Sequence, residues 1–435
     1  MTSPTAGSAP DPTPAAGAPA SPQAGPSLLE GLRVLDLSTM IAAPLAATLL
    51  ADYGADVVKV EMPGPGDHVR RFGAQKDGQG LYWKALSRGK RSVSLDLRRP
   101  EGRDLLLQWV EQFDVLVENF RPGTLERWGL GPDVLRAANP RLVVLRVTAY
   151  GQDGPYAEQP GFGTLAEALA GLASVSGFPD RPPLLPAYPL ADIMAGNLGA
   201  TAVLAALQRR HLTGAGDVVD LAIYEAALKL VEINVVEYQQ LGTEHGRTGN
   251  RYGPAAPRGS YQCRDGLWIA LSGSTQAMAV HVLRTIGGEE LVADPRFTTN
   301  AERRTHVEEL DALISAWCGA RDRAEALAGL TAGGCAVGPL ESVATMMDNP
   351  QVAHRGSIAT VEDPDLGPVA MTGVFPRFQE APTGVGRPGP TDVGADTDAV
   401  LAHDLGLDAA TLAALRADGV TDGPDRGHES IPGAV

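Results

Sequence analysis

The chain has few cysteines for its length of 435 residues. Cys263, Cys318 and Cys335 lie far apart, so they form neither a disulfide framework nor a zinc motif of the C-x-x-C type. Free thiols of this kind are typical of a reducing compartment, and we therefore expect a cytoplasmic protein. The eight histidines form no H-E-x-x-H motif, and we expect no metal site.

The sequence also lacks membrane and secretion signals. No uninterrupted apolar run reaches the ~18 residues that a membrane-spanning helix needs. Residues 1–27 are rich in Pro, Ala and Ser, so we expect a disordered tail rather than a signal peptide, and a second, flexible tail at 421–435. With 52 acidic against 36 basic residues the net charge is −16, which argues against nucleic acid or a membrane as a partner.

What the sequence does contain is an alternation of short apolar strands and amphipathic helices. RVLDLS (33–38) and DVVKVE (56–61) have the pattern of buried strands on either side of a helix at 44–55. Comparable strands, separated by helices, follow at 91–97, 114–120 and 142–151. This pattern predicts an α/β fold with an open, mostly parallel sheet.

The second half of the chain has a different pattern. Helices are predicted at 164–177 and 193–214, and a strand followed by one long helix at 216–241. The segment 250–274 reads as a loop and an antiparallel hairpin, and the helices after it, up to about 330, predict a smaller α+β domain. From about 335 onward the pattern is mixed again.

Two fingerprints of common enzyme classes are missing. The turn after the first predicted strand reads STMIAAPLAA and has no G-x-G-x-x-G, which argues against NAD or FAD. The chain also has no G-x-S-x-G, the motif that marks a serine nucleophile.

A run of basic residues stands out in this acidic chain. Seven cations fall within 40 residues, and several of them lie at the ends of predicted strands. Guanidinium groups suit phosphate geometry, so the run could hold a polyanion, whereas composition alone favours scattered, solvated charge. The seven are Arg88, Lys90, Arg91, Arg98, Arg99, Arg121 and Arg127.

One acid, Asp192, opens the apolar segment AYPLADIMAGN. An Asp before a helical run is usually its N-cap. A second interpretation is chemical, because the small residues Ala191, Ala195, Gly196 and Gly199 would leave room for a bulky ligand. The positive end of the helix would then hold the carboxylate ionised as a nucleophile. The residues alone leave both interpretations open.

Several colinear segments match a known family. They read LEGLRVLDLSTMIAAPLAATLLADYGADVVKVE, DVLVENFRPGTLERWGL, NPRLVVLRVTAYGQDGPY and PLADIMAG. Through them the chain resembles family III CoA-transferases (the CaiB/BaiF superfamily) from about Leu28 to Val420. The resemblance implies an interlaced homodimer with a large Rossmann-like CoA-binding domain (28–225), a linker helix and small domain (226–334), and a segment that returns to the large domain (335–420).

The resemblance also implies a set of site residues. Asp192 matches the family's catalytic aspartate, and no cofactor is implied beyond coenzyme A as a substrate. One basic position of the family falls on Met62, for which Arg70 or Arg71 could substitute. The substrate pocket would include Phe162, Gly163, Arg251 and Arg258. The implied CoA contacts are Met40, Ile41, Ala42, Leu95, Asp96, Leu97, Arg98, Asn119, Phe120, Arg121 and Arg127.

The resemblance also implies a reaction. We expect transfer of CoA from a donor acyl-CoA, such as succinyl-CoA, to a free carboxylic acid through an anhydride and a thioester on Asp192. Racemases of the superfamily are an alternative, but they pair the aspartate with a histidine where this chain has Phe162, which cannot exchange a proton. A non-catalytic acyl-CoA-binding protein is the third interpretation.

Overall fold

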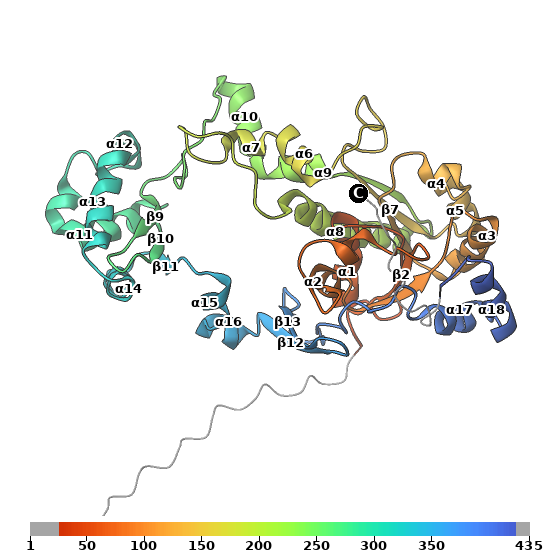
Figure 1. The fold of residues 1–435 in the computed structure, drawn as a ribbon. Helices are drawn as coiled ribbons and strands as arrows, with labels where there is room; N and C mark the ends of the chain where they lie inside the picture. The colour runs from red at the N-terminus through yellow and green to blue at the C-terminus, as the bar shows by residue number, and fades with distance from the viewer. Residues whose placement is uncertain (1–25, 423–435) are drawn as a thin grey trace, which may run out of the picture.

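Six parallel strands form the centre of the larger domain (Figure 1). The computed structural model describes residues 26–422, so the predicted tails at 1–27 and 421–435 lie almost entirely outside the described residues. The strand order is β5–β2–β1–β6–β7–β8, the order of a doubly wound α/β sheet. The strands are β1 (Arg33–Asp36), β2 (Asp56–Glu61), β5 (Lys90–Ser94), β6 (Val115–Glu118), β7 (Val143–Thr148) and β8 (Val218–Ala222).

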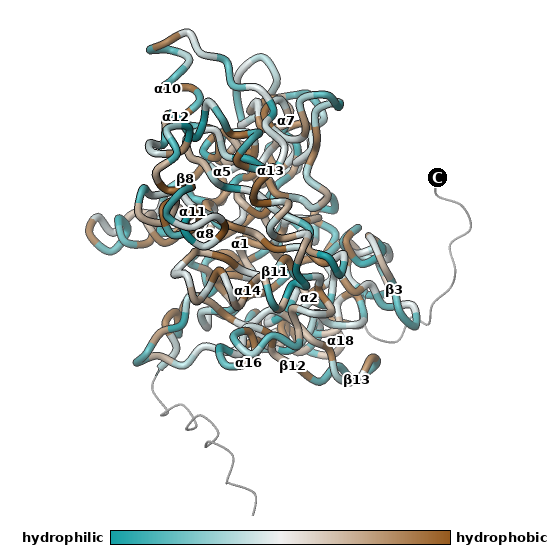
Figure 2. The backbone as a smooth tube through the Cα atoms, turned by 90° about the vertical axis from the view of Figure 1, so that its left-hand side faces the viewer, coloured by the Kyte–Doolittle hydropathy of each residue, from teal (hydrophilic) through white to brown (hydrophobic). Residues whose placement is uncertain are grey.

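Helices cover both faces of this sheet because successive strand residues point to opposite sides. Val34, Val143 and Leu145 pack toward α1 and α8, whereas Leu35 and Val144 pack toward α3 and α17. In Figure 2 the apolar stretches of α1 and α8 run through the middle of the molecule. The helices that cover the two faces are α1 (Ala42–Asp52), α8 (Leu190–Thr213), α3 (Pro100–Trp109), α5 (Pro132–Ala138), α17 (Thr397–Leu405) and α18 (Ala409–Ala417).

Short elements fill the connections of the large domain. After β2 come the 3-10 turn η1 (His68–Arg71) and a small hairpin. The helix expected at 164–177 is two helices, because Gly171 takes a left-handed conformation (φ 79°) between them. These elements are β3 (Gln75–Lys76), β4 (Gln79–Gly80), α2 (Leu81–Leu86), η2 (Val110–Gln112), α4 (Thr124–Arg127), α6 (Gly163–Leu169) and α7 (Leu172–Val175).

The small domain is a three-stranded antiparallel sheet with helices packed on it. The predicted hairpin within 250–274 is present as β9 and β10. Because β11 also pairs with β10, the chain leaves this sheet after Pro339 and not at 335 as predicted. The elements are β9 (Arg258–Gln262), β10 (Trp268–Ser272), β11 (Val337–Pro339), α11 (Gln276–Ala293), α12 (Asn300–Thr305), α13 (Val307–Gly319) and α14 (Arg323–Ala332).

Two connections join the domains, which lie at opposite ends of the molecule in Figure 1. The single long helix expected after β8 is broken by a 3-10 turn at 229–231. The return connection ends beside β5, where the Asp396 amide donates to the Ser92 carbonyl at 2.8 Å. The connecting elements are α9 (Ile223–Leu228), η3 (Lys229–Val231), α10 (Glu232–Leu241), α15 (Val343–Met347), α16 (Pro350–Arg355), β12 (Ile358–Asp363) and β13 (Gly367–Thr372).

By length and composition alone, α8 is long and apolar enough to cross a membrane, although polar residues interrupt its apolar run. In the fold, however, its small residues pack against α1 and the sheet. Its apolar character therefore serves the core of the large domain.

Candidate active site

A cavity of about 260 Å³ lies where the strand order reverses, between β1 and β6. In open α/β sheets this position, at the carboxyl ends of the strands, is the usual ligand site. Five of the CoA contacts implied by the resemblance line the cavity. They are Leu95, Asp96, Leu97, Arg98 and Phe120.

The other implied CoA contacts lie around this cavity in different ways. Asn119 accepts a hydrogen bond from the Thr39 amide at 2.8 Å and donates to its carbonyl at 2.7 Å, so it fixes the loop after β1. Met40 belongs to that loop. The side chains of Ile41 and Ala42 are buried in the core and leave only backbone for a ligand. Arg121 and Arg127 are exposed after β6.

Sequence reasoning missed several residues of the cavity wall. Trp128 packs edge-to-face on Phe120 with ring centroids 5.0 Å apart, and it could have been noticed because it follows Arg127 in a segment that carries the resemblance. Leu37 and Thr39 follow β1, the others come from β2 and the turn after it, and no local pattern marks them. The missed residues are Leu37, Thr39, Lys59, Val60, Glu61, Gly66, Asp67, His68 and Trp128.

The basic run does not act as one cluster. Arg88 and Lys90 are buried, so the interpretation as solvated charge is wrong for them. Because they are paired, they are also unavailable to a polyanion. Arg98, which lines the cavity, and Arg99, Arg121 and Arg127 are exposed. The ion pairs are Arg88 with Asp52 at 2.6 Å, Lys90 with Asp36 at 2.8 Å, Arg91 with Asp56 at 2.6 Å and Arg98 with Asp96 at 2.8 Å.

Arg70 cannot replace the basic residue that the family carries at the position of Met62. Its guanidinium binds Glu61 through two hydrogen bonds of 2.7 Å and stacks on the Trp83 ring at 3.8 Å. The remaining N–H groups donate to carbonyls of residues 390–392. Arg71 is exposed and donates to the Pro65 carbonyl, so of the two it is the one that could reach a ligand.

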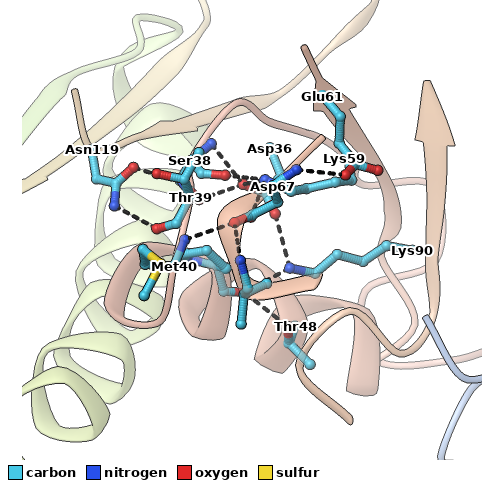
Figure 3. A network of polar contacts seen from close by, with 12 residues as sticks. Asp36, Ser38, Thr39, Met40, Thr48, Lys59, Glu61, Asp67, Lys90 and Asn119 are labelled. Atoms are coloured by element: carbon cyan, nitrogen blue, oxygen red, sulfur yellow. Dashed lines mark hydrogen bonds and ion pairs between the residues drawn. The ribbon is translucent and has the colours of Figure 1, made fainter. Parts of the chain in front are cut away.

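Under the cavity lies a buried network of charges (Figure 3). Lys59 is 3.2 Å from Asp67 and 3.8 Å from Asp36, and Lys90 is 2.8 Å from Asp36. Burial alone would raise the pKa of Asp36, but the two lysines hold it below its usual value. Burial would likewise lower the pKa of Lys59, but Asp36, Asp67 and Glu61 raise it. The carboxylates therefore keep Lys59 charged inside the protein.

This network fixes the loop between β1 and α1. Asp67 accepts hydrogen bonds from the Met40 amide at 3.1 Å and the Val69 amide at 3.0 Å. Lys59 donates to the Ser38 carbonyl. Met40 is held at φ 66°, a conformation that costs energy for a residue other than glycine. Polar contacts on both sides therefore impose the shape of the loop that lines the cavity.

Asp192 lies in the first turn of α8, and its interpretation as the N-cap is wrong. The capping position is Pro189, whose side chain makes no capping hydrogen bond. The small residues after Asp192 do not leave room for a ligand either. A Cβ on Gly196 would approach Leu45 to 2.8 Å, and one on Gly199 would approach Leu145 to 3.1 Å, so these glycines let α8 pack closely on α1 and the sheet.

The Asp192 carboxylate lies directly against the backbone of Gly163, the first residue of α6. A Cβ built on Gly163 would lie 2.1 Å from its Oδ2. Burial, followed by the negative charge of Glu167, raises the pKa of Asp192 from 3.8 to about 6, although a backbone hydrogen bond acts in the opposite direction. The predicted stabilisation of the ionised form at the helix start is thus outweighed, yet at pH 7 about nine tenths of the groups are ionised.

The predicted pocket residues do not all lie near Asp192. Phe162 precedes Gly163 and is 67% exposed. Arg251 binds Asp311 at 2.7 Å, and Arg258 stacks over the Tyr252 ring at 4.3 Å. Arg258 begins β9 and Asp311 belongs to α13, and these elements of the small domain lie on the opposite side of the molecule from α8 in Figure 1. Their place in the pocket stays a prediction.

The sequence match decides the family. The family model described as CoA-transferase family III matches residues 29–397, most of the chain. The chain belongs to this family. It is an enzyme of the CoA-transferase type, and its parallel sheet with flanking helices is a fold that it shares with a CaiB/BaiF family protein of known structure.

Similar proteins span nearly the whole chain. The succinyl-CoA–D-citramalate CoA-transferase of Chloroflexus aurantiacus is 40% identical over 398 residues, 91% of this chain and 99% of that protein. The beta subunit of succinyl-CoA–L-malate CoA-transferase from the same organism is 40% identical and covers 87% of this chain and 94% of its own. A CaiB/BaiF family protein from Brucella suis has a TM-score of 0.77 at 31% identity, covering 87% of this chain and 100% of its own.

The contact between Gly163 and Asp192 gives a first prediction. In Gly163→Ala the new methyl group would displace the Asp192 carboxylate, which can turn away more easily than the backbone can move. A misplacement of about 1 Å in a reacting group lowers rates about 100-fold. We therefore expect kcat for CoA transfer to fall about 100-fold, measured with saturating donor and acceptor.

Gly319→Ala is the matched control, because nothing lies within 4 Å of its added Cβ and it is in the small domain. Thermal unfolding of both variants should stay close to that of the parent. A Gly163→Ala enzyme with parental kcat would show that Asp192 does not need its observed position.

Proposed function

We propose that the enzyme moves CoA from a donor acyl-CoA, such as succinyl-CoA, to a free carboxylic acid, with Asp192 as the nucleophile. The observation that carries this proposal is the partly buried Asp192 carboxylate, held at the start of α8 against Gly163. The names of the relatives support succinyl-CoA as the donor, since two relatives at 40% identity are named for it.

The proposed reaction proceeds through covalent steps on Asp192. Its carboxylate oxygen attacks the thioester carbonyl, the C–S bond breaks, and CoA leaves as a thiolate beside a mixed anhydride. The thiolate then attacks the aspartyl carbonyl and releases the donor acid, which leaves an aspartyl-CoA thioester. The acceptor carboxylate attacks this thioester to give a second anhydride, and the returning thiolate attacks its acyl carbonyl. The products are the new acyl-CoA and the free Asp192 carboxylate.

The cavity at the switch point of the sheet is the proposed CoA site. Its wall combines apolar and aromatic groups, Leu95, Phe120 and Trp128, which suit a ring system and an aliphatic chain. Exposed Arg121 and Arg127 nearby suit phosphates. From this cavity the β1–α1 loop leads to α1, whose Leu45 touches α8 one turn after Asp192. The bound CoA would thus extend along this loop toward the nucleophile.

We also propose that two chains form an interlaced homodimer. The two domains of one chain lie apart, and the connections between them expose many large apolar side chains, more than is usual for a stable monomer. A second chain would cover them and would bring its small domain, with Arg251 and Arg258, over α8. The exposed residues are Ile233, Val235, Val236, Tyr238, Leu241, Leu340, Val343 and Met347.

Light scattering coupled to size exclusion tests the dimer. The expected mass is about twice the 45.4 kDa of one chain at all concentrations that can be measured. Replacing Val236 and Leu241 with glutamate on the exposed face of α10 should reduce this mass. Glutamate at the exposed Leu267, in the hairpin turn of the small domain, is the control, and it should leave the mass unchanged. A monomeric parent protein would contradict the interlaced dimer.

An assay of donors against acceptors tests the function. Succinyl-CoA is incubated with single acids, among them malate, citramalate, glutarate and acetate, and the acyl-CoA products are identified by mass spectrometry. A new acyl-CoA that appears together with an equal amount of succinate supports the proposal. Hydrolysis to free CoA alone, or α-proton exchange without an acceptor acid, would contradict it and would favour a thioesterase or a racemase.

A further inference from the structure

The start of α8 is held by Glu167, a residue to which the proposed reaction assigns no role. The N-cap Pro189 has no side-chain donor or acceptor, so the first N–H groups of the helix need acceptors from elsewhere. Glu167 supplies one of them, because its Oε1 accepts a hydrogen bond from the Ala191 amide at 3.1 Å. Only 2% of Glu167 is exposed. A buried carboxylate from α6 thus takes the place of a cap one residue before Asp192.

Glu167 and Gly163 act from the same face of α6. They are four residues apart in one helix and so lie one above the other. Gly163 places its backbone against the Asp192 carboxylate, while Glu167 binds the amide of the preceding residue. Together they fix the position of Asp192 from one side.

We propose that Glu167 is a positioning residue, which holds the start of α8 through the Ala191 amide and so orients the neighbouring Asp192 carboxylate. This assignment rests on the proposed function of Asp192. Among the described residues, the titratable groups that act on Asp192 are Glu167 on α6 and Tyr82 on α2. Leu45, which faces α8 from α1, is apolar. Of these two groups, Glu167 is the one whose charge acts on Asp192.

The charge of Glu167 has a chemical consequence. A carboxylate of higher pKa is the stronger nucleophile, since nucleophilicity rises with basicity. Burial and Glu167 together raise the pKa of Asp192 to about 6. Asp192 is then more basic than an ordinary aspartate and still mostly ionised at pH 7. Glutamine at position 167 would keep the hydrogen-bond acceptor and remove the charge, which separates the two effects.

The experiment follows the rate of the aspartyl-CoA thioester on Asp192 by rapid quench and mass spectrometry, from about pH 4.5 to 8. In the parent enzyme the rate should fall below about pH 6, because the protonated carboxyl is not nucleophilic. In Glu167→Gln the midpoint of this fall should move to lower pH by about half a unit or more. In Glu167→Ala, which also loses the acceptor, the rate at pH 7.5 should fall about 10- to 100-fold.

Two further variants make the result decisive. Glu167→Asp keeps the charge, so its midpoint should stay with the parent even if its rate falls. Glu158→Gln removes an exposed carboxylate upstream of α6 and should change neither. A parental midpoint in Glu167→Gln, with the thioester still forming, would overturn the role of Glu167 and leave the proposed function standing. A parent enzyme that forms no adduct on Asp192 at any pH would overturn the proposed function itself.

Discussion

Replacing Asp192 with asparagine is expected to lower kcat for CoA transfer by about four orders of magnitude or more. Asparagine has nearly the same shape, but its amide cannot attack a thioester, so the anhydride and the thioester can no longer form on this residue. The fold should tolerate the change. Asp192 is not the N-cap of α8, and its ionised form is disfavoured by burial, so removing the charge should not destabilise the helix.

The measurement combines kinetics with mass mapping. The parent enzyme, incubated with donor alone, should carry a CoA-sized adduct on the peptide that contains Asp192, and the variant should carry none. CoA affinity, measured by calorimetry, should stay within a few-fold of the parent value, because Asp192 does not line the cavity proposed to bind CoA. Asp180→Asn is the matched control, since Asp180 is exposed in the loop before α8. Full transfer by Asp192→Asn would exclude the covalent route.

The local pattern of the sequence predicted the strands of the large domain well. The strand at 56–61 has the predicted bounds, and the others differ by a few residues at their ends. The order of the strands in the sheet could not be read in the same way, because pairing depends on contacts between segments far apart. The long helix predicted after β8 is a case in which the local pattern failed. Its apolar pattern continues through 229–231, where the backbone breaks into a 3-10 turn.

The candidate site was predictable to a different extent for each residue. Asp192 stood out because it is a lone acid before an apolar run. Glu167 did not, because a glutamate in the helix pattern TLAEALAG reads as an exposed polar residue, and only the packing of α8 buries it. The basic run misled for a similar reason. Arg88 pairs with Asp52 and Lys90 with Asp36, residues 36 and 54 positions away that no local pattern connects.

The buried charges beneath the cavity give the largest expected effect on stability. Lys59 is 1% exposed. Among the residues that the structure describes, it is the one cation that forms an ion pair with Asp67. In Lys59→Met, Asp67 would be left as an uncompensated buried charge, while Asp36 would keep Lys90. Breaking a buried pair in this way costs about 3–5 kcal/mol. We expect the free energy of unfolding in denaturant to fall by about this amount.

The loop that lines the cavity connects this loss to ligand binding. Without Lys59 the Ser38 carbonyl loses a donor, and Asp67 can no longer be expected to hold the Met40 amide in its left-handed conformation. CoA affinity should therefore fall in any variant that still folds. Lys59→Met combined with Asp67→Asn should recover part of the stability, because the unpaired charge is gone. Lys76→Met, on the exposed β3–β4 hairpin, is the control, and a Lys59→Met protein as stable as this control would show that the network does not hold the loop.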